Sequence, residues 1–240
     1  MQENNTIYLD GETLSSSEVQ MVAEGKASVA IPQDSWVKIN AARSVIDGIL
    51  ERGETVYGIN TGFGALVKER ISVEDLADLQ TNLIRSHATG LGEFMPKELV
   101  RAMMVTRANS LAKGCSGVHP DVVNQLIAFI NNDICPAIPR IGSLGASGDL
   151  APLSHMALSL IGEGEVLTET GVGPTRDALI ENGLIGVQLR AKDGLSLING
   201  TSQMLSLLVA AEQRLSQLLP LADIIMCCSL EARKGSIRPA

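Results

Sequence analysis

The sequence predicts a mainly α-helical fold with a few short strands. Along most of the chain, apolar residues recur at spacings of three and four, which is the repeat of one helix face. Signals that start a helix, a capping-box-like sequence or a proline, precede several of these stretches. The 240 residues are 45% hydrophobic and 19% charged, a composition typical of a globular protein and not of a disordered one.

The first half of the chain should contain two short strands followed by helices. Residues 6–9 and 28–31 have the composition of strands. The segment 34–53 has helical spacing and ends at a glycine. A capping-box-like sequence opens the helix 72–87, and a proline fits the first turn of the helix 96–114.

The second half should contain further helices around one irregular segment. A proline opens the helix 120–130, and another helix covers 149–161. The segment 165–190 lacks a clear period, and a short helix is expected near its middle. Its short strands are expected at 166–167 and 187–189.

The last helical stretch, from 194 to about 234, is apolar on more than one face. Pro220 predicts a kink or a break within it. A helix that is apolar all round is buried in a larger bundle. We therefore expect other subunits, or further chain, to cover this stretch.

Charge and composition exclude several classes of function. The 19 basic and 27 acidic residues give a net charge of −8, which argues against binding of nucleic acid. The four cysteines form no C-x-x-C pair and no histidine pair has ligand spacing, so we expect buried free thiols and no metal site. The N-terminus lacks a signal-peptide pattern, and polar residues interrupt the apolar stretch 195–211. We expect a cytoplasmic protein with no membrane segment.

The segment 142–149, Gly-Ser-Leu-Gly-Ala-Ser-Gly-Asp, is the strongest candidate for chemistry. Its small residues allow a tight turn that approaches another backbone closely, and Asp149 is placed to cap the helix that follows. Taken by itself, the segment could also be an anion-binding helix entry. A serine hydrolase that uses Ser147, Asp149 and His155 is a third interpretation, although two of these residues lie on one helix.

Three other polar residues stand out from their surroundings. Tyr57, one of two tyrosines, lies in the glycine-rich stretch 57–64, where it could serve as an acid, a base or a packing anchor. His87 lies on the apolar stripe of its helix, where a histidine is usually a hydrogen-bonded core residue. Asn199 begins an Asn-Gly pair in an apolar helix, which is locally unfavourable and marks a functional site or a kink.

Together these segments resemble the aromatic amino acid ammonia-lyases and aminomutases. The resemblance is carried, in order, by YGINTGFG (57–64), NLIRSHATGLGE (82–93), GSLGASGDLAPL (142–153) and LINGTSQM (197–204). It implies the helical-bundle fold of these enzymes, with an N-terminal domain over 1–193 and the start of the central helical bundle over 194–240.

The resemblance also implies a prosthetic group and roles for individual residues. In this family an Ala-Ser-Gly tripeptide, here Ala146, Ser147 and Gly148, cyclises and loses water to give 4-methylidene-imidazol-5-one (MIO). Gly148 and Ala146 suit the cyclisation because they are small. Tyr57 matches the family's general base, and Asn199 matches the asparagine that lies against MIO and substrate. No metal is implied.

The pair Ser86-His87 is most similar to the histidine-specific members, in which the histidine meets the substrate imidazole. The resemblance thus implies conversion of L-histidine to urocanate and ammonia, a step of histidine catabolism. A tyrosine ammonia-lyase, a tyrosine 2,3-aminomutase and a non-catalytic assembly module remain alternatives. Family members are longer homotetramers with sites shared between subunits, so we expect this chain to need other copies or a missing C-terminal half.

Overall fold

The computed structural model describes residues 5–62, 71–72, 75–142, 148–236 and 238. It confirms a mainly helical fold. The helices are α1 (Ser16–Ala23), α2 (Gln33–Glu51), α3 (Leu76–His87), α4 (Lys97–Ala112), α5 (Pro120–Asn131), α6 (Leu150–Leu160), α7 (Thr175–Glu181), α8 (Asp193–Ile198) and α9 (Ser202–Ala232). The predicted helices at 34–53, 72–87, 96–114, 120–130 and 149–161 are confirmed to within a few residues.

Three pairs of short strands lie around these helices. The strands are β1 (Asn5–Tyr8), β2 (Ala27–Ala30), β3 (Leu91–Phe94), β4 (Pro139–Ile141), β5 (Glu165–Thr168) and β6 (Gly171–Pro174). β1 and β2 pair in parallel, whereas β3–β4 and β5–β6 are antiparallel. The strand predicted at 187–189 is wrong. That segment is irregular, and its first amide, from Val187, donates to the carbonyl of Leu160.

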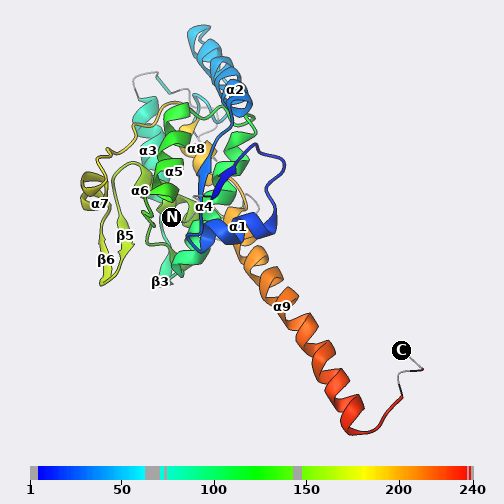
Figure 1. Ribbon diagram of the computed structural model, residues 1–240. Coiled ribbons are helices and arrows are strands. Elements are labelled where there is room, and N and C mark those ends of the chain that lie inside the picture. The colour runs from blue at the N-terminus through cyan, green and yellow to red at the C-terminus, as the bar shows by residue number, and fades with distance from the viewer. Residues whose placement is uncertain (1–4, 63–70, 73–74, 143–147, 237, 239–240) are drawn as a thin grey trace.

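Helix α4 runs through the centre of the core (Figure 1), and its side chains are buried on almost every side. It packs against α1, α5 and α9. Because aromatic residues are scarce, methionine and aliphatic side chains fill this space: Met103 and Met104 of α4 are fully buried, beside Leu126 of α5. Two arginines of α4, Arg101 and Arg107, are buried among them.

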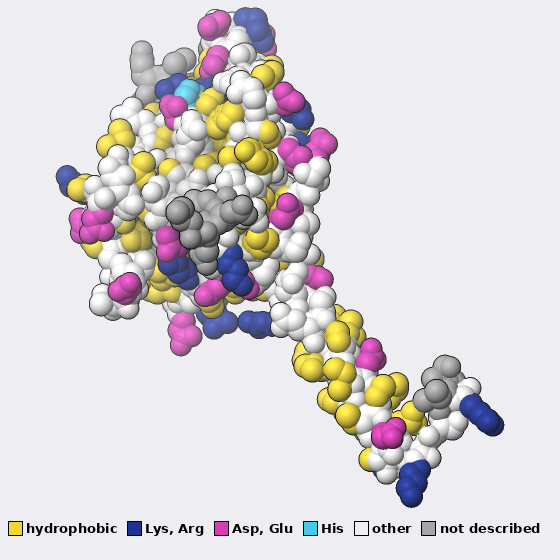
Figure 2. All heavy atoms as spheres, in the orientation of Figure 1, with side chains coloured by type: hydrophobic (Ala, Val, Ile, Leu, Met, Phe, Trp, Pro, Cys, Tyr) yellow, Lys and Arg dark blue, Asp and Glu magenta, His cyan; other side chains and the backbone are white. Residues whose placement is uncertain are grey.

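The C-terminal stretch differs from the prediction in two ways. The helix breaks at residues 199–201, between α8 and α9, and it continues without interruption through Pro220. Only the first turns of α9 pack on the core, through Ser206 and Val209. The remainder extends away from the other helices (Figure 1) and exposes a row of apolar side chains (Figure 2). These include Leu215, Leu218, Leu219, Leu221, Ile224, Ile225 and Met226.

By length and apolar composition alone, α9 is the one helix among the described residues that could cross a membrane, and the apolar window that qualifies it is fully exposed. This exposure agrees with the expectation that the stretch needs a cover, and the source of that cover, other subunits or further chain, stays a prediction. The predicted burial of the cysteines is wrong for three of them: Cys227 and Cys228 lie on the exposed part of α9, and Cys115 is also exposed. Cys135 is buried, which raises the pKa of its thiol to about 12.

Candidate functional site

The candidate site is built around the junction between α8 and α9, where Gly148 meets Gly200. The two glycines form an isolated parallel bridge. Gly148 has a φ of 87°, and a Cβ at this position would collide with the carbonyl oxygen of Gly200. The close backbone approach predicted for the glycine-rich segment is thus confirmed at Gly148. Ala146 and Ser147 lie outside the described residues.

Asp149 fixes this contact, but not in the way the sequence predicts. Its amide donates to the Gly200 carbonyl at 2.7 Å. Its buried carboxylate makes no cap of α6, the helix that follows. One carboxylate oxygen instead accepts from the amides of Gln203 and Met204, at 2.9 and 3.0 Å. Asp149 therefore caps α9, whose positive N-terminal dipole favours a carboxylate.

Tyr57 lies in a turn that packs against α8. Gly58, next to it, has a φ of 75°, and a Cβ there would lie 2.8 Å from Cδ2 of Leu195. The buried Asn60 closes the turn: its side chain accepts from the amide of Val56 at 2.9 Å and donates to the carbonyl of Glu54 at 2.6 Å. The Tyr57 side chain is 58% exposed. The turn therefore holds the backbone of Tyr57 while its ring stays accessible.

His87 occupies the C-terminal end of α3. Its Nδ1 lies 2.9 Å from the carbonyl oxygen of Leu83 and 3.0 Å from Oγ of Ser86. Because a carbonyl only accepts, this contact assigns the proton to Nδ1 and leaves Nε2 of the neutral ring as an acceptor. The same helix reaches α8 through Gln80, whose side-chain oxygen accepts from the amide of Leu195 at 3.2 Å.

Asn199 is the C-cap of α8, and its side chain is exposed. Its carbonyl accepts from Nη2 of Arg107 at 3.0 Å. The same nitrogen donates to the carbonyl of Ser196. Arg107 comes from α4, and nothing in its local sequence marks it as part of a site. Its burial lowers the pKa of the guanidinium to about 10.

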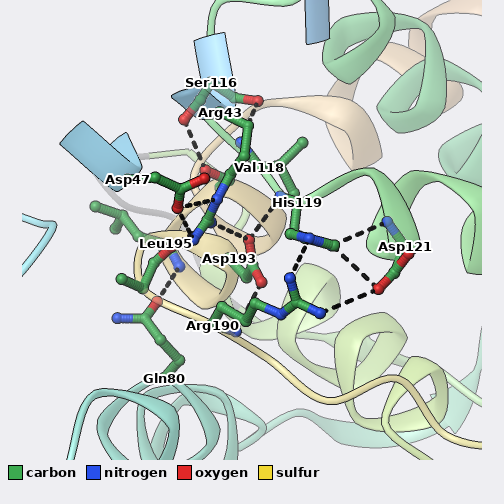
Figure 3. A network of polar contacts seen from close by, with 12 residues as sticks. Arg43, Asp47, Gln80, Ser116, Val118, His119, Asp121, Arg190, Asp193 and Leu195 are labelled. Atoms are coloured by element: carbon green, nitrogen blue, oxygen red, sulfur yellow. Dashed lines mark hydrogen bonds and ion pairs between the residues drawn. The ribbon is translucent and has the colours of Figure 1, made fainter. Parts of the chain in front are cut away.

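A second polar network holds the other end of α8 (Figure 3). The fully buried carboxylate of Asp193 accepts from the amides of His119 and Arg190, at 2.8 and 2.7 Å, and lies 3.5 Å from Nη1 of Arg43. Burial is the main cause that raises the pKa of Asp193 to about 6. The ring of His119, the N-cap of α5, lies between Arg190 and Asp121 (Figure 3).

The structure therefore brings three of the predicted residues to one short helix and its end. Gly148 contacts the junction directly, and Asn199 belongs to it. The turn that carries Tyr57 packs against Leu195 of α8, four residues before Asn199. His87 is farther away: α3 contacts α8 through Gln80, and His87 lies seven residues later on α3, about 10 Å along the helix axis. Sequence reasoning missed Arg107 because its partners lie 89 and 92 positions away.

The contacts of His155 and Asp149 argue against the serine-hydrolase interpretation. Nε2 of His155 accepts from the amide of Gly90 at 3.0 Å. Oδ2 of Asp149 accepts from two amides at the start of α9. Among the described residues, His155 and Asp149 therefore have separate partners and form no relay.

Comparison with known proteins identifies relatives of the whole chain. A family model described as aromatic amino acid lyase matches residues 14–240. A MIO-dependent tyrosine 2,3-aminomutase from Streptomyces globisporus is 42% identical over 97% of this chain and 43% of its own length. A histidine ammonia-lyase from Geobacillus thermodenitrificans is 43% identical over 96% of this chain and 46% of its own.

A solved structure shows the same fold. The crystal structure of histidine ammonia-lyase from Trypanosoma cruzi superposes with a TM-score of 0.89 at 37% identity, over 96% of this chain and 45% of that one. The chain thus spans less than half the length of the relatives it matches. Relatives named for histidine and for tyrosine are about equally similar to it.

Replacing the carboxylate that joins the glycine-rich segment to α9 should destabilise the fold. For Asp149→Ala we expect a loss of about 2–3 kcal/mol in the free energy of unfolding, because two buried amides lose their acceptor. Asp149→Asn keeps one oxygen and should lose less. Urea denaturation measures both, with Ser15→Ala, an exposed cap of α1, as a control that should cost about 1 kcal/mol. Equal losses for all three variants would contradict this role.

The buried carboxylate of Asp193 should make stability depend on pH. Its pKa rises from 3.8 to about 6 on folding, so the folded chain holds the proton more tightly than the unfolded chain does. Its contribution to the free energy of unfolding therefore falls as the pH rises from about 4 to about 6. Asp193→Asn should be less stable at low pH but should lack this fall. Urea midpoints measured across this range test it, and parallel curves for the two proteins would refute it.

Proposed function

Because this chain belongs to the aromatic amino acid lyase family, we propose that it supplies the N-terminal part of an ammonia-lyase that converts L-histidine to urocanate and ammonia. The reaction breaks the Cα–N bond and removes one β-proton, so that a C=C bond forms. The observation that carries the proposal is the close contact of Gly148 with the carbonyl of Gly200. This contact supports the proposal because it joins the segments 142–153 and 197–204 at one junction.

We propose that Ala146, Ser147 and Gly148 form MIO. The ends of the segment fit this: Gly148 has a positive φ and no room for a Cβ, and a Cβ at Gly142 would lie 2.9 Å from Cδ of Pro152. The N-terminus of α6 begins two residues after Gly148, so the positive end of its dipole lies close to Gly148 in the chain. The group supplies an electrophilic carbon for the substrate amine.

The remaining roles belong to side chains of the described chain. Tyr57, exposed on its fixed turn, takes the β-proton at its hydroxyl as general base. Asn199 binds the substrate through its exposed amide. Nε2 of His87 accepts a hydrogen bond from the substrate imidazole, a role consistent with the proton on Nδ1. The hydroxyl of a tyrosine substrate can also donate a hydrogen bond to Nε2 of His87. L-tyrosine is therefore the alternative substrate, as the name of the tyrosine 2,3-aminomutase relative suggests.

We also propose partners and a cellular location for this protein. The exposed apolar side chains of α9 need a cover, and the chain spans less than half of each relative. We propose that further chain and other copies, in a homotetramer, complete the bundle around α9 and the active site. The protein acts in the cytoplasm on a small amino acid.

Formation of the prosthetic group is tested by mass. In the complete protein, the peptide that contains Ala146, Ser147 and Gly148 should lack two water molecules. Ser147→Ala should not lose the water that the serine hydroxyl supplies and should lose turnover, because no methylidene can form without that hydroxyl. Peptide-resolved mass spectrometry checks both proteins. Full mass in the wild-type peptide would overturn the proposal.

The role of Tyr57 is tested with a matched pair of variants. Tyr57→Phe should lower kcat roughly 10²- to 10⁴-fold, the usual contribution of a general base, and leave the dehydrated peptide intact. Tyr8→Phe alters the chain's other tyrosine, 62% exposed on β1, and should leave kcat unchanged. The release of urocanate from L-histidine gives the rate. Turnover of L-tyrosine with none of L-histidine would refute the histidine assignment and favour the alternative.

A further inference from the structure

Arg107 is buried in the core, and the described part of the chain offers it no counterion. Only 4% of the residue is exposed, and among the described residues no carboxylate lies within ion-pair distance of it. Its Nε has no hydrogen-bond partner in the described part of the chain. A buried, unneutralised cation is costly, so the contacts that it does make should matter.

Those contacts are the last carbonyls of α8. Nη2 donates to the carbonyl oxygens of Ser196 and Asn199, which are among the groups that a helix end leaves without partners. The C-terminal end of a helix is negative, so it attracts a cation. Arg107 therefore acts as the C-terminal cap of α8, supplied from a distant helix.

The guanidinium also lies against the junction itself. A Cβ at Gly200 would collide with Nη1 of Arg107, and a Cβ at Gly148 would collide with the carbonyl of Gly200. Arg107, Gly200 and Gly148 are thus stacked with no space for an extra methyl group between them. A shift of the guanidinium would move the Gly200 peptide, and with it the surface on which Gly148 rests.

Arg101, six residues earlier on α4, provides a comparison. It is equally buried and also donates to two carbonyls, those of Val22 and Ile130. In contrast to Arg107, it has a carboxylate partner, Asp133, at 2.7 Å. It lies away from the α8–α9 junction. A matched substitution at Arg101 therefore measures how much stability is lost when any buried arginine of α4 is altered. An effect seen only at Arg107 is then an effect on the junction.

We propose that Arg107 is a positioning residue that sets both Asn199 and the Gly200 backbone against which Gly148 lies. This inference rests on the proposed function. The flat fork of the guanidinium presents Nη2 to two carbonyls and Nη1 to Gly200. A lysine ammonium keeps the charge but presents a single point, so it cannot reproduce this arrangement.

The test compares Arg107→Lys with Arg101→Lys in the complete protein, with Arg107→Gln as a second variant at the same site. Three quantities are measured: urea stability, hydrogen exchange of amides 196–204, and the rate at which the 146–148 peptide loses two waters. Both lysine variants should lose stability. Only the Arg107 variants should show faster exchange at 196–204 and roughly 10- to 100-fold slower dehydration, the effect of a misplacement of about 1 Å.

Each outcome decides one question. Exchange at 196–204 that is unchanged in both Arg107 variants would overturn the proposal. Faster exchange with dehydration at the wild-type rate would also overturn it, since Arg107 would then stabilise α8 without setting the site. If the wild-type peptide never loses water, the proposed function fails, and with it the role of Arg107 in cyclisation. A defect of equal size in Arg101→Lys would show that the effect is not specific to the junction.

Discussion

The contact between Gly148 and Gly200 is the constraint on which the candidate site depends. Gly148 holds a positive φ and approaches the Gly200 backbone so closely that it has no room for a Cβ, whereas a Cβ at Gly200 would collide with Nη1 of Arg107. Asp149 then joins the segment to the junction twice, by its amide to Gly200 and by its carboxylate to the start of α9. Segments about fifty residues apart in sequence thereby become one rigid unit. A reactive turn that must cyclise needs such a unit, because proximity has to be built in before the reaction begins.

Helix α8 is the second half of this arrangement, and it is too short to be stable by itself. It has six residues, whereas isolated helices become stable in water only near 12–15 residues. Hydrogen bonds at both ends hold it in place. At the N-terminal end the carboxylate of Asp193 accepts from the amides of His119 and Arg190, and at the C-terminal end the guanidinium of Arg107 donates to the last carbonyls. Helix α3 adds a hydrogen bond from the side, through Gln80. The position of Asn199 therefore depends on side chains from three other helices: Arg43 of α2, Gln80 of α3 and Arg107 of α4.

Helix α9 begins at the candidate site and extends away from the core. Its first turn is fixed by Asp149, and its later turns expose a row of apolar side chains larger than a soluble surface usually carries. In the comparisons the chain spans less than half the length of each relative. Under the proposed function, the copies or chain that cover the exposed part of α9 pack on the same helix whose first turn Asp149 holds.

The sequence by itself determined the helical class, most helix boundaries and the four motifs that carry the resemblance. These features are local: helical spacing, start signals and contiguous strings such as GSLGASGDLAPL need no knowledge of distant partners. The tertiary structure alone decided the break at 199–201, the helix that Asp149 caps and the part played by Arg107. It also corrected the strand predicted at 187–189. Each of these depends on partners about 30 to 90 residues away, and periodicity reports only which face of an element is apolar, not which backbone group lies against it.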